Sequence, residues 1–575
     1  MSSGGARRKR PSCSSARNSN RATKSCRCNW WCVNPPERRL HDSSPAGWYL
    51  REELRTGHGA VQETGATPSG TAIRLVLVVL AALSLRLPGM RWGYGLPGFA
   101  DRFVALHPDE TFFVEVARNL EEGKPFRRSY VLGLGQALRL VLAWGRSRGI
   151  LISGGDLVTA GRILSLGSGL LAVLLTYWLG RALSGDAWTA LAAATLIALN
   201  SLCAVYSHLC TADMAYTFLL YLFAGLAWSG IEKRRPQRLV SAAVVAGTAM
   251  AVKFGPVLLP SVLLLGRGFP RRRLGGGLVC LAVCAAMFVA VQGGAFNAES
   301  ARAILRSFLH DNLGGFKHAR WQNPVVYAME LVRSGGLPAA ALTAAGALAL
   351  LRGRRLRSPA ILIAFLPLGL HAAGILALNL PFPRHILPLL PAAALCAAWR
   401  ISRMGEPAKV LVLCAIWSAA LALSDAYAFV YDARKEILRT LREFVPVGTP
   451  VAVDPGFRVP LERLYPRSRV EDAALLVLHE SWTFRFLPSE LHPLGIPDRD
   501  ELYHVGPADL RMYRSIQCRL REGTLKGVYR AGPIAVLPEA LLYRRLWGNF
   551  FKFCGECRLL AEVDAGAVGG GGQRP

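Results

Sequence analysis

The sequence predicts a mainly α-helical, polytopic membrane protein with about 11 transmembrane helices, followed by a small α/β domain outside the membrane. Of its 575 residues, 52% are hydrophobic and only 18% are charged, whereas soluble proteins carry about 25% charged residues. The basic residues gather in the first 70 residues and in short clusters between long apolar runs. The net charge of +30 is therefore typical of the loops of a multi-spanning membrane protein, and it does not indicate a nucleic-acid-binding protein.

Residues 1–70 are rich in Arg, Ser, Gly and Pro and show no apolar periodicity. This composition predicts a disordered, basic tail on the cytoplasmic side. The first apolar run, residues 72–87, has no small-residue cleavage site after it. We therefore expect an uncleaved signal-anchor rather than a signal peptide.

Ten further apolar runs follow the first. A full span needs about 20 apolar residues, and several of the runs have that length. The fifth and sixth runs are shorter, and they predict a shallow or broken hairpin around Gly255-Pro256. The ten runs are residues 157–180, 187–206, 212–230, 239–252, 257–266, 274–291, 337–351, 359–378, 386–399 and 410–430.

Basic clusters predict the orientation of these spans, because loops rich in Lys and Arg stay in the cytoplasm. With the basic tail inside, eleven spans place all the basic clusters on the cytoplasmic side. This requires that residues 131–144, which include Arg139, lie along the outer surface as an interfacial helix and do not span. The outward-facing segments are then 88–156, 207–211, 293–336, 379–385 and the chain from 431 onward, and the cytoplasmic basic clusters lie at 233–238, 267–273, 352–357 and 400–409.

The last part of the chain, residues 431–575, predicts a small extracytoplasmic domain. A helical pattern covers residues 433–444, and short strand patterns cover 451–453, 474–477 and 534–536. Cys554 and Cys557 form a lone C-x-x-C pair, for which a local disulfide or no role at all fits better than a zinc site.

The first outer loop contains His107-Pro108-Asp109-Glu110 at the start of a helical pattern. Two adjacent carboxylates just outside a membrane can take up a proton or bind a divalent cation. They can equally serve the helix start, because Asp and Glu favour the first turn of a helix. No other cluster in the sequence indicates a metal site, and no cofactor is expected.

Further charged residues stand at the predicted outer ends of apolar runs. An ionisable group that enters a membrane segment usually faces a polar cavity, although an acidic residue can also cap a helix and a basic one can extend to the interface. Together these charged residues suit the binding of a lipid phosphate, because the phosphate lies at the membrane interface, where cations can neutralise it. These residues are Arg162, Asp213, Lys253, Arg384 and His385.

Five segments of the chain, in order, are LHPDETFFVEVARNL, VTAGRILSLGSGLLAVLLTYWLGRALSG, YSHLCTADMAYTFLLYLF, GTAMAVKFGPVLLPSVLL and FPRHILPLLPAAALCAA. Together they resemble the dolichyl-phosphate-mannose–protein mannosyltransferase superfamily. This superfamily belongs to the integral-membrane GT-C glycosyltransferases and includes bacterial transferases that modify lipid A with aminoarabinose. The resemblance covers about residues 72–430 and ends before the C-terminal domain. It implies a GT-C-like transmembrane domain over 71–430, with outer loops at 88–156 and 293–336.

The resemblance also implies roles for individual residues. Asp109 matches the catalytic carboxylate. Glu110 beside it and Asp213, which matches the acidic residue before the next outward-starting helix, are expected to belong to the catalytic group. Lys253 and Arg384 resemble positions associated with binding of the lipid phosphate. His385 stands where an aromatic residue is more usual. The resemblance favours sugar transfer without a metal ion. In the outer loop 293–336, where the family often has a substrate-covering loop, His318 is a candidate substrate contact.

We therefore expect an inverting glycosyltransferase of the plasma (inner) membrane, which uses a polyprenyl-phosphate-linked sugar, either a hexose or a pentose. Asp109 would act as the base towards a hydroxyl acceptor on a protein, lipid or glycan. Asp213 would orient the site, and Arg384, Lys253 and Arg162 would hold the phosphate. A glycan ligase of lipid-linked sugars, a transporter or flippase, and a non-catalytic scaffold are the alternatives; a transporter would place charges near the bilayer midplane.

Overall fold

The computed structural model describes most of the chain beyond residue 67. The described residues are 68–99, 102–124, 131–269, 273–293, 298–307, 309, 323–352, 358–378, 382–469, 473–481, 515–516, 518–535, 537–547 and 552–563. The predicted basic tail, residues 1–70, therefore lies almost wholly outside the described residues. His318 lies outside them.

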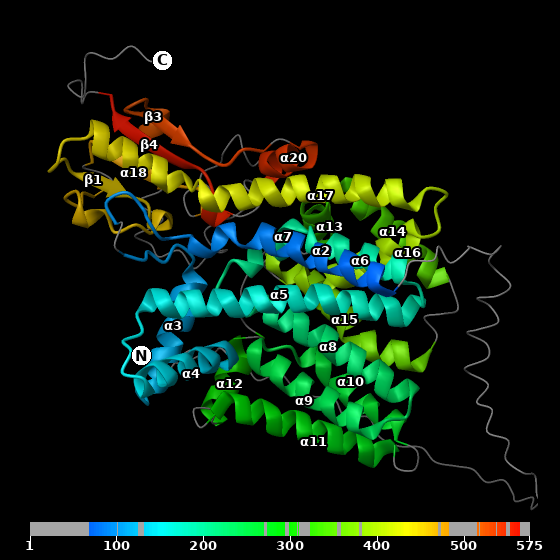
Figure 1. Ribbon diagram of the computed structural model, residues 1–575. Coiled ribbons are helices and arrows are strands. Elements are labelled where there is room, and N and C mark those ends of the chain that lie inside the picture. Colours follow the sequence, from blue (N-terminus) through cyan, green and yellow to red (C-terminus); the bar gives the residue numbers. More distant parts are fainter. Residues whose placement is uncertain are drawn as a thin grey trace, which may run out of the picture. The chain divides into compact units, whose positions relative to one another are not determined.

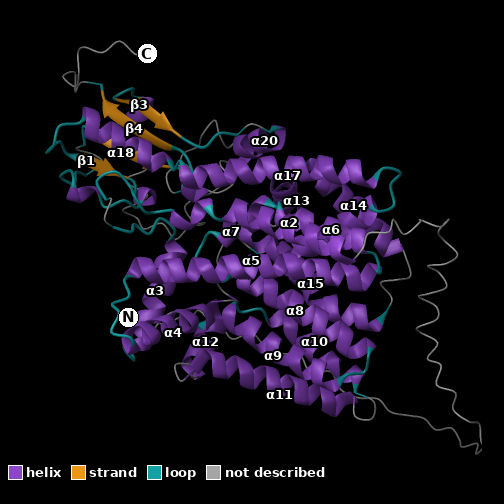
Figure 2. Ribbon diagram, in the orientation of Figure 1, coloured by secondary structure: helices purple, strands orange, loops and turns teal. Residues whose placement is uncertain are grey.

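The fold is mainly helical, as the sequence predicts, and Figure 2 shows the strands confined to its C-terminal part. The α-helices in chain order are α2 (Pro68–Arg86), α3 (Pro108–Glu121), α4 (Gly133–Ser147), α5 (Gly154–Ser184), α6 (Ala187–Ala198), α7 (Ser201–Ser207), α8 (Asp213–Glu232), α9 (Pro236–Val252), α10 (Leu259–Leu264), α11 (Arg273–Gln292), α12 (Ala298–Ser307), α13 (Asn323–Gly335), α14 (Leu337–Arg352), α15 (Pro359–Leu376), α16 (Leu390–Ile401), α17 (Pro407–Val430), α18 (Ala433–Phe444) and α20 (Pro538–Trp547).

Six helices in the described part of the chain are long and apolar enough to cross a membrane, or seven if the bent pair α6–α7 is one span. This supports an integral membrane protein. The predicted number of 11 spans is not confirmed, because Gly, Pro and Asn residues divide several apolar runs into shorter helices. Asn200, for example, ends the run at α6 and caps α7 by accepting a hydrogen bond from the Cys203 N–H at 3.1 Å, and the two helices meet at 59°.

The long helices lie side by side with their axes nearly parallel, as Figure 1 shows for α5, α8, α11 and α17. Small residues allow this close packing, which is usual for helices in membranes. A side chain at Gly247 of α9 would lie only 2.3 Å from the Cys284 carbonyl oxygen of α11. One at Gly346 of α14 would lie 2.1 Å from the Cys396 carbonyl oxygen of α16.

The predicted break around Gly255-Pro256 is confirmed. α9 ends at Val252, Lys253 adopts an extended conformation, and Pro256 begins the 3-10 turn Pro256–Leu258 that leads into α10. A proline cannot donate to a helical hydrogen bond and restricts the residue before it. The break therefore lifts Lys253 out of the helix end and leaves its side chain available to the neighbouring helices.

The run 131–144, which we expected to lie along the outer surface as a helix, forms α4. It has only 15 residues and is not among the helices long enough to span. Gly135 of α4 packs against the Val116 side chain of α3, so α4 supports the helix that carries Asp109. The side of the membrane on which it lies stays a prediction.

The C-terminal part begins with α18, which coincides with the predicted helix 433–444. A four-stranded sheet follows, in the order β1-β2-β4-β3, with β1 and β2 parallel and the other pairs antiparallel. Its strands are β1 (Val451–Val453), β2 (Leu475–His479), β3 (Leu525–Ala531) and β4 (Cys557–Glu562).

The first two predicted strands are confirmed. The third, at 534–536, is wrong over its described residues, 534 and 535. Ile534 and Ala535 lie outside any strand, because the chain leaves the sheet at Pro533, whose nitrogen has no hydrogen to donate to a neighbouring strand. The sequence analysis predicted neither β3 nor β4. For β3 the reason is that it exposes most of its residues, including Lys526 and Arg530.

Candidate active site

Asp109 lies in the first turn of α3. His107 is the N-cap residue, and its Nδ1 accepts the Asp109 N–H at 3.1 Å, while Pro108 takes the first helical position. Both features favour a helix start, because the cap satisfies a free backbone donor and proline needs none. Asp109 and Glu110 therefore stand in the first turn, where their charges also suit the helix dipole.

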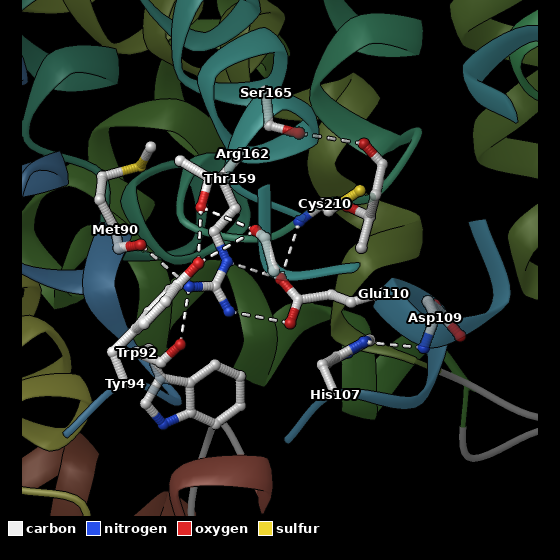
Figure 3. A network of polar contacts seen from close by, with 12 residues as sticks. Met90, Trp92, Tyr94, His107, Asp109, Glu110, Thr159, Arg162, Ser165 and Cys210 are labelled. Carbon is white, nitrogen blue, oxygen red and sulfur yellow. Dashed lines mark hydrogen bonds and ion pairs between the residues drawn. The ribbon is translucent and has the colours of Figure 1, made fainter. Parts of the chain in front are cut away.

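Glu110 forms a buried ion pair with Arg162 of α5, shown in Figure 3. The guanidinium binds both carboxylate oxygens, at 2.8 and 2.9 Å, and donates to the backbone carbonyls of Met90 and Trp92, at 2.9 and 2.7 Å. Neither side chain has any exposed surface. Arg162 is thus enclosed by protein groups, and Glu110 binds Arg162. The expected roles of Arg162 at a lipid phosphate and of Glu110 in the reaction stay predictions.

The same pair fixes the segment that carries Asp213. The Glu110 Oε1 atom accepts the Cys210 N–H at 3.0 Å, and the Ser165 hydroxyl donates to the Thr211 carbonyl at 3.1 Å. Gly161 of α5 leaves just enough room for Cys210, because a side chain there would lie 2.1 Å from its sulfur. The start of α8, at Asp213, is thus tied to the start of α3.

Asp109 and Asp213 each bind one of the predicted cations. Asp109 pairs with Arg384, which lies in the 3-10 segment Pro383–Leu389, and Asp213 pairs with Lys253 at 2.5 Å. The side chains of Asp109, Arg384 and Lys253 remain 33%, 27% and 30% exposed. Unlike the Glu110–Arg162 pair, these groups are open to a ligand.

The two pairs are linked through aromatic side chains: the Lys253 ammonium lies 6.0 Å from the centre of the Tyr216 ring, which is 6.4 Å from that of His371, and His371 Nε2 is 2.9 Å from the His385 carbonyl, next to Arg384. Burial alone would raise the pKa of Asp109, but Arg384 and Lys253 favour the carboxylate, and the pKa is lowered from its ordinary value of 3.8. Asp109 is therefore ionised at neutral pH. In Figure 3 its side chain points away from the Glu110–Arg162 pair.

Aromatic rings support both cations. The Arg384 guanidinium lies 5.0 Å from the centre of the Phe382 ring, and the Lys253 ammonium lies 6.0 Å from that of Tyr216. Such contacts stabilise a partly desolvated cation.

His385 supports the segment that carries Arg384. Its Nδ1 is 3.1 Å from the Tyr327 hydroxyl, and its carbonyl is 2.9 Å from His371 Nε2. The contacts observed for His385 are thus with protein groups. Whether it touches a substrate stays a prediction.

His107 is a site residue whose role the sequence analysis missed. It caps the helix that carries Asp109, and its ring packs against Phe553, with 4.4 Å between ring centres. Burial lowers its pKa below the ordinary value of 6.5, although the neighbouring carboxylates of Asp109 and Glu110 favour the charged form. The neutral ring is the form that accepts the Asp109 N–H. The sequence His-Pro-Asp before a helical pattern could have predicted that His107 caps the helix. The contact of His107 with Phe553 could not have been predicted, because it depends on the tertiary fold.

Within the described residues, no group of three or more His, Cys, Asp or Glu side chains is placed to hold a metal ion. Asp109 and Glu110, the candidates for a divalent cation, do not converge, because each binds a different arginine.

A groove of about 700 Å³ lies beside α3, and no residue of the two open ion pairs lines it. Its walls come from the loop after Arg102, from the side of α3 that carries Thr111, Glu115 and Arg118, and from the start of α5 at Ser153.

A family model described as dolichyl-phosphate-mannose-protein mannosyltransferase matches residues 140–292. This match confirms the resemblance to that superfamily of membrane glycosyltransferases. A comparison with curated proteins finds no match.

Among solved structures, the chain is similar to ArnT from Cupriavidus metallidurans bound to undecaprenyl phosphate, with 19% identity and a TM-score of 0.44, over 66% of this chain and 73% of that one. It is similar to the same protein in the apo state, with 15% identity and a TM-score of 0.45, over 72% and 94%. It is also similar to the Archaeoglobus fulgidus oligosaccharyltransferase tethered with an acceptor peptide, with 12% identity and a TM-score of 0.44, over 87% and 89%.

Proposed function

We propose that this chain, with its match to the mannosyltransferase family, is an inverting glycosyltransferase that moves a sugar from a polyprenyl-phosphate donor to a hydroxyl acceptor. One observation carries the proposal. Four charged side chains from four separate segments, Asp109, Asp213, Lys253 and Arg384, meet as two neighbouring ion pairs that remain partly exposed.

The two cations are suited to hold the donor phosphate. A phosphate is a good leaving group when its developing charge is neutralised, and preformed cations at that position stabilise the transition state. Arg384 and Lys253 are partly exposed and lie at neighbouring positions. Arg162, which the sequence analysis assigned to the phosphate, is enclosed by protein groups and is not part of this proposal.

Asp109 is proposed as the general base. It takes the proton of the acceptor hydroxyl while that oxygen attacks the anomeric carbon, and the bond from that carbon to the phosphate oxygen breaks with its electron pair moving to the phosphate. The attack from the opposite side inverts the anomeric configuration. A phosphate that shares Arg384 would weaken the effect that lowers the pKa of Asp109, so donor binding makes the carboxylate a stronger base.

Asp213 is proposed as a positioning residue. It is almost wholly buried and binds Lys253 directly, so it fixes the ammonium near Asp109. Its own position depends on the Glu110–Arg162 pair through Cys210 and Thr211.

The transporter alternative receives less support from the site. Charged residues within the helices, such as Arg86 and the pair Arg333–Asp425, are buried and bonded to protein groups, which is a structural use. On our proposal the enzyme lies in the plasma (inner) membrane, with the ion pairs on the extracytoplasmic side.

The test uses Asp109→Asn and Asp109→Glu in matched membrane preparations. A panel of radiolabelled polyprenyl-phosphate hexoses and pentoses is offered with endogenous acceptors, and the release of polyprenyl phosphate and the labelled product are both measured. Loss of a general base costs about 10² to 10⁴ in rate, so the Asn variant should lose turnover while its amount and its melting temperature persist.

The Glu variant restores the charge but displaces the carboxylate by about one methylene, and rates are sensitive to a shift of about 1 Å. We expect partial rescue at most. An Asn variant with wild-type turnover would show that Asp109 is only part of a helix start and would refute the mechanism.

A further inference from the structure

The described residues 532–535 and 537–547, between β3 and β4, leave the sheet and run along α17. The Ser424 hydroxyl of α17 donates to the Ile534 carbonyl at 2.8 Å, and the Trp417 indole N–H donates to the Glu539 carboxylate. Seven residues of helix separate Ser424 from Trp417, which is about 10 Å along the axis. The segment therefore descends about 10 Å beside α17.

This descent reaches the middle of a helix that is long enough to span a membrane. Trp417 stands ten residues after the start of α17 at Pro407 and thirteen before its end at Val430. These intervals are about 15 and 20 Å, and the hydrocarbon core of a bilayer is about 30 Å thick. Glu539, at the start of α20, therefore lies near the middle of the span.

From that depth α20 carries the chain back towards the sheet. Tyr543 donates to the Glu330 carboxylate of α13, and Arg544 donates to the Pro533 carbonyl at 3.2 Å and to Glu556, beside β4, at 2.9 Å. Figure 1 shows α20 alongside the middle part of α17. The segment is thus a hairpin whose tip points down α17, and we call its described residues, 532–535 and 537–547, the C-terminal hairpin.

Protein groups bind part of the backbone of the hairpin. The carbonyls of Pro533 and Ile534 accept from Arg544 and Ser424, and the Leu541 N–H donates to the Leu537 carbonyl at 3.0 Å. Irregular backbone occurs at membrane depth only where protein supplies its hydrogen bonds. The carbonyls of Pro533 and Ile534, in the descending part of the hairpin, meet that condition.

The side chains of the hairpin fall into two groups: the charged ones bind protein groups, and the exposed large ones are apolar. Among described residues 532–544 the charged ones are Glu539 and Arg544, and both bind protein groups. The exposed large side chains are all apolar: Ile534 is 57% exposed, Leu541 51% and Leu542 48%. In contrast β3, which belongs to the same domain, exposes Lys526 and Arg530.

The apolar face of the hairpin continues that of α17. Ile416, next to Trp417, is 66% exposed, and Leu423, next to Ser424, is 58% exposed. On a membrane-spanning helix such residues face lipid, because their exposure to water would cost free energy in proportion to their apolar area. The hairpin is attached at Trp417 and Ser424, each one residue after Ile416 and Leu423 respectively.

We propose that the C-terminal hairpin is a re-entrant membrane element, and that its face of Ile534, Leu541 and Leu542 contacts lipid acyl chains. The C-terminal domain is then inserted beside α17 and does not lie wholly outside the membrane, as the sequence analysis expected for all residues beyond 431. The inward position of Glu539, bonded to Trp417, agrees with the rule that a carboxylate at this depth faces the protein.

The test is site-specific photo-crosslinking of the full-length protein in native membranes. Residue Leu542 is replaced by p-benzoylphenylalanine, with Ile416 as the lipid-facing control and Val528 of β3, which is 52% exposed, as the matched control outside the hairpin. After irradiation, lipid adducts on the protein are identified by mass spectrometry. Leu541 is the second position, used if the probe at Leu542 reduces the amount of folded protein.

We expect adducts with lipid acyl chains at Leu542 and at Ile416 to similar extents, and at least tenfold fewer at Val528. Absence of lipid adducts at both hairpin positions, while Ile416 gives them, would overturn the proposal. A cross-link from Leu542 to a second copy of the chain or to another protein would also overturn it, because the face would then be an interface between proteins.

Discussion

Replacement of Glu110 by Gln should destabilise the protein strongly, although the side chain keeps its size. The Arg162 guanidinium has no exposed surface and makes four hydrogen bonds, two of them to Glu110. In Glu110→Gln one amide oxygen can still accept, but the amide NH₂ replaces an acceptor and faces an arginine N–H. A buried cation then lacks its counter-charge.

Removal of one partner of a buried ion pair costs about 3–5 kcal/mol. This corresponds to a fall of roughly 100- to 5,000-fold in the ratio of folded to unfolded protein. In a chain of this size the midpoint of thermal unfolding should drop by about 3–10 °C. Activity should fall in parallel with the folded fraction, because the same pair holds the segments that carry Asp109 and Asp213.

Thermal unfolding of purified protein in one detergent measures this effect. The matched control is Glu406→Gln, which removes the same charge from an exposed pair with Lys409 at 2.8 Å. Exposed pairs contribute little, so its midpoint should not change measurably. The double change Glu110→Met with Arg162→Met should cost less than the sum of the single changes, because no buried charge remains unpaired.

A Glu110→Gln variant that melts like the wild type but has lost turnover would refute this reasoning. Glu110 would then take part in the reaction itself, as the sequence analysis predicted.

Three further results are expected. Lys253→Ala and Arg384→Ala should each weaken donor binding by about 10- to 150-fold, since a charge-assisted contact contributes roughly 1.5–3 kcal/mol; wild-type donor titrations for both would place the phosphate elsewhere. Burial holds the pKa of His107 below 6.5, so as the pH falls the unfolded chain takes up a proton on His107 before the folded chain does. The contribution of His107 to the free energy of unfolding therefore declines below about pH 6.5, by up to roughly 1.4 kcal/mol per pH unit. His107→Asn, which keeps a cap, should reduce the fall in unfolding midpoint between pH 7 and 5.5, and an unchanged fall would contradict the assignment. Reporter fusions at Arg355 and Gly523 should report opposite sides of the membrane, and results on the same side would contradict the predicted orientation.

The sequence alone predicts features that depend on local chemistry. Apolar runs predict the helices, because a helix that is buried needs apolar residues whether it packs against protein or against lipid. The break before Pro256 and the start of α18 after Asp432 follow from the backbone limits of proline and from helix capping. The candidate charged residues could be named because ionisable groups are rare beside apolar runs.

The tertiary structure alone decides which of these charges pair. Asp109 lies 275 residues from Arg384 in sequence, and no local pattern states that Arg162 binds Glu110 and not a phosphate. The partner of a buried charge depends on which helix ends meet, and that meeting is set by packing over the whole bundle. The same reason explains the C-terminal hairpin: its apolar residues suit a strand or a helix equally, and only the contacts with Trp417 and Ser424 place it along α17.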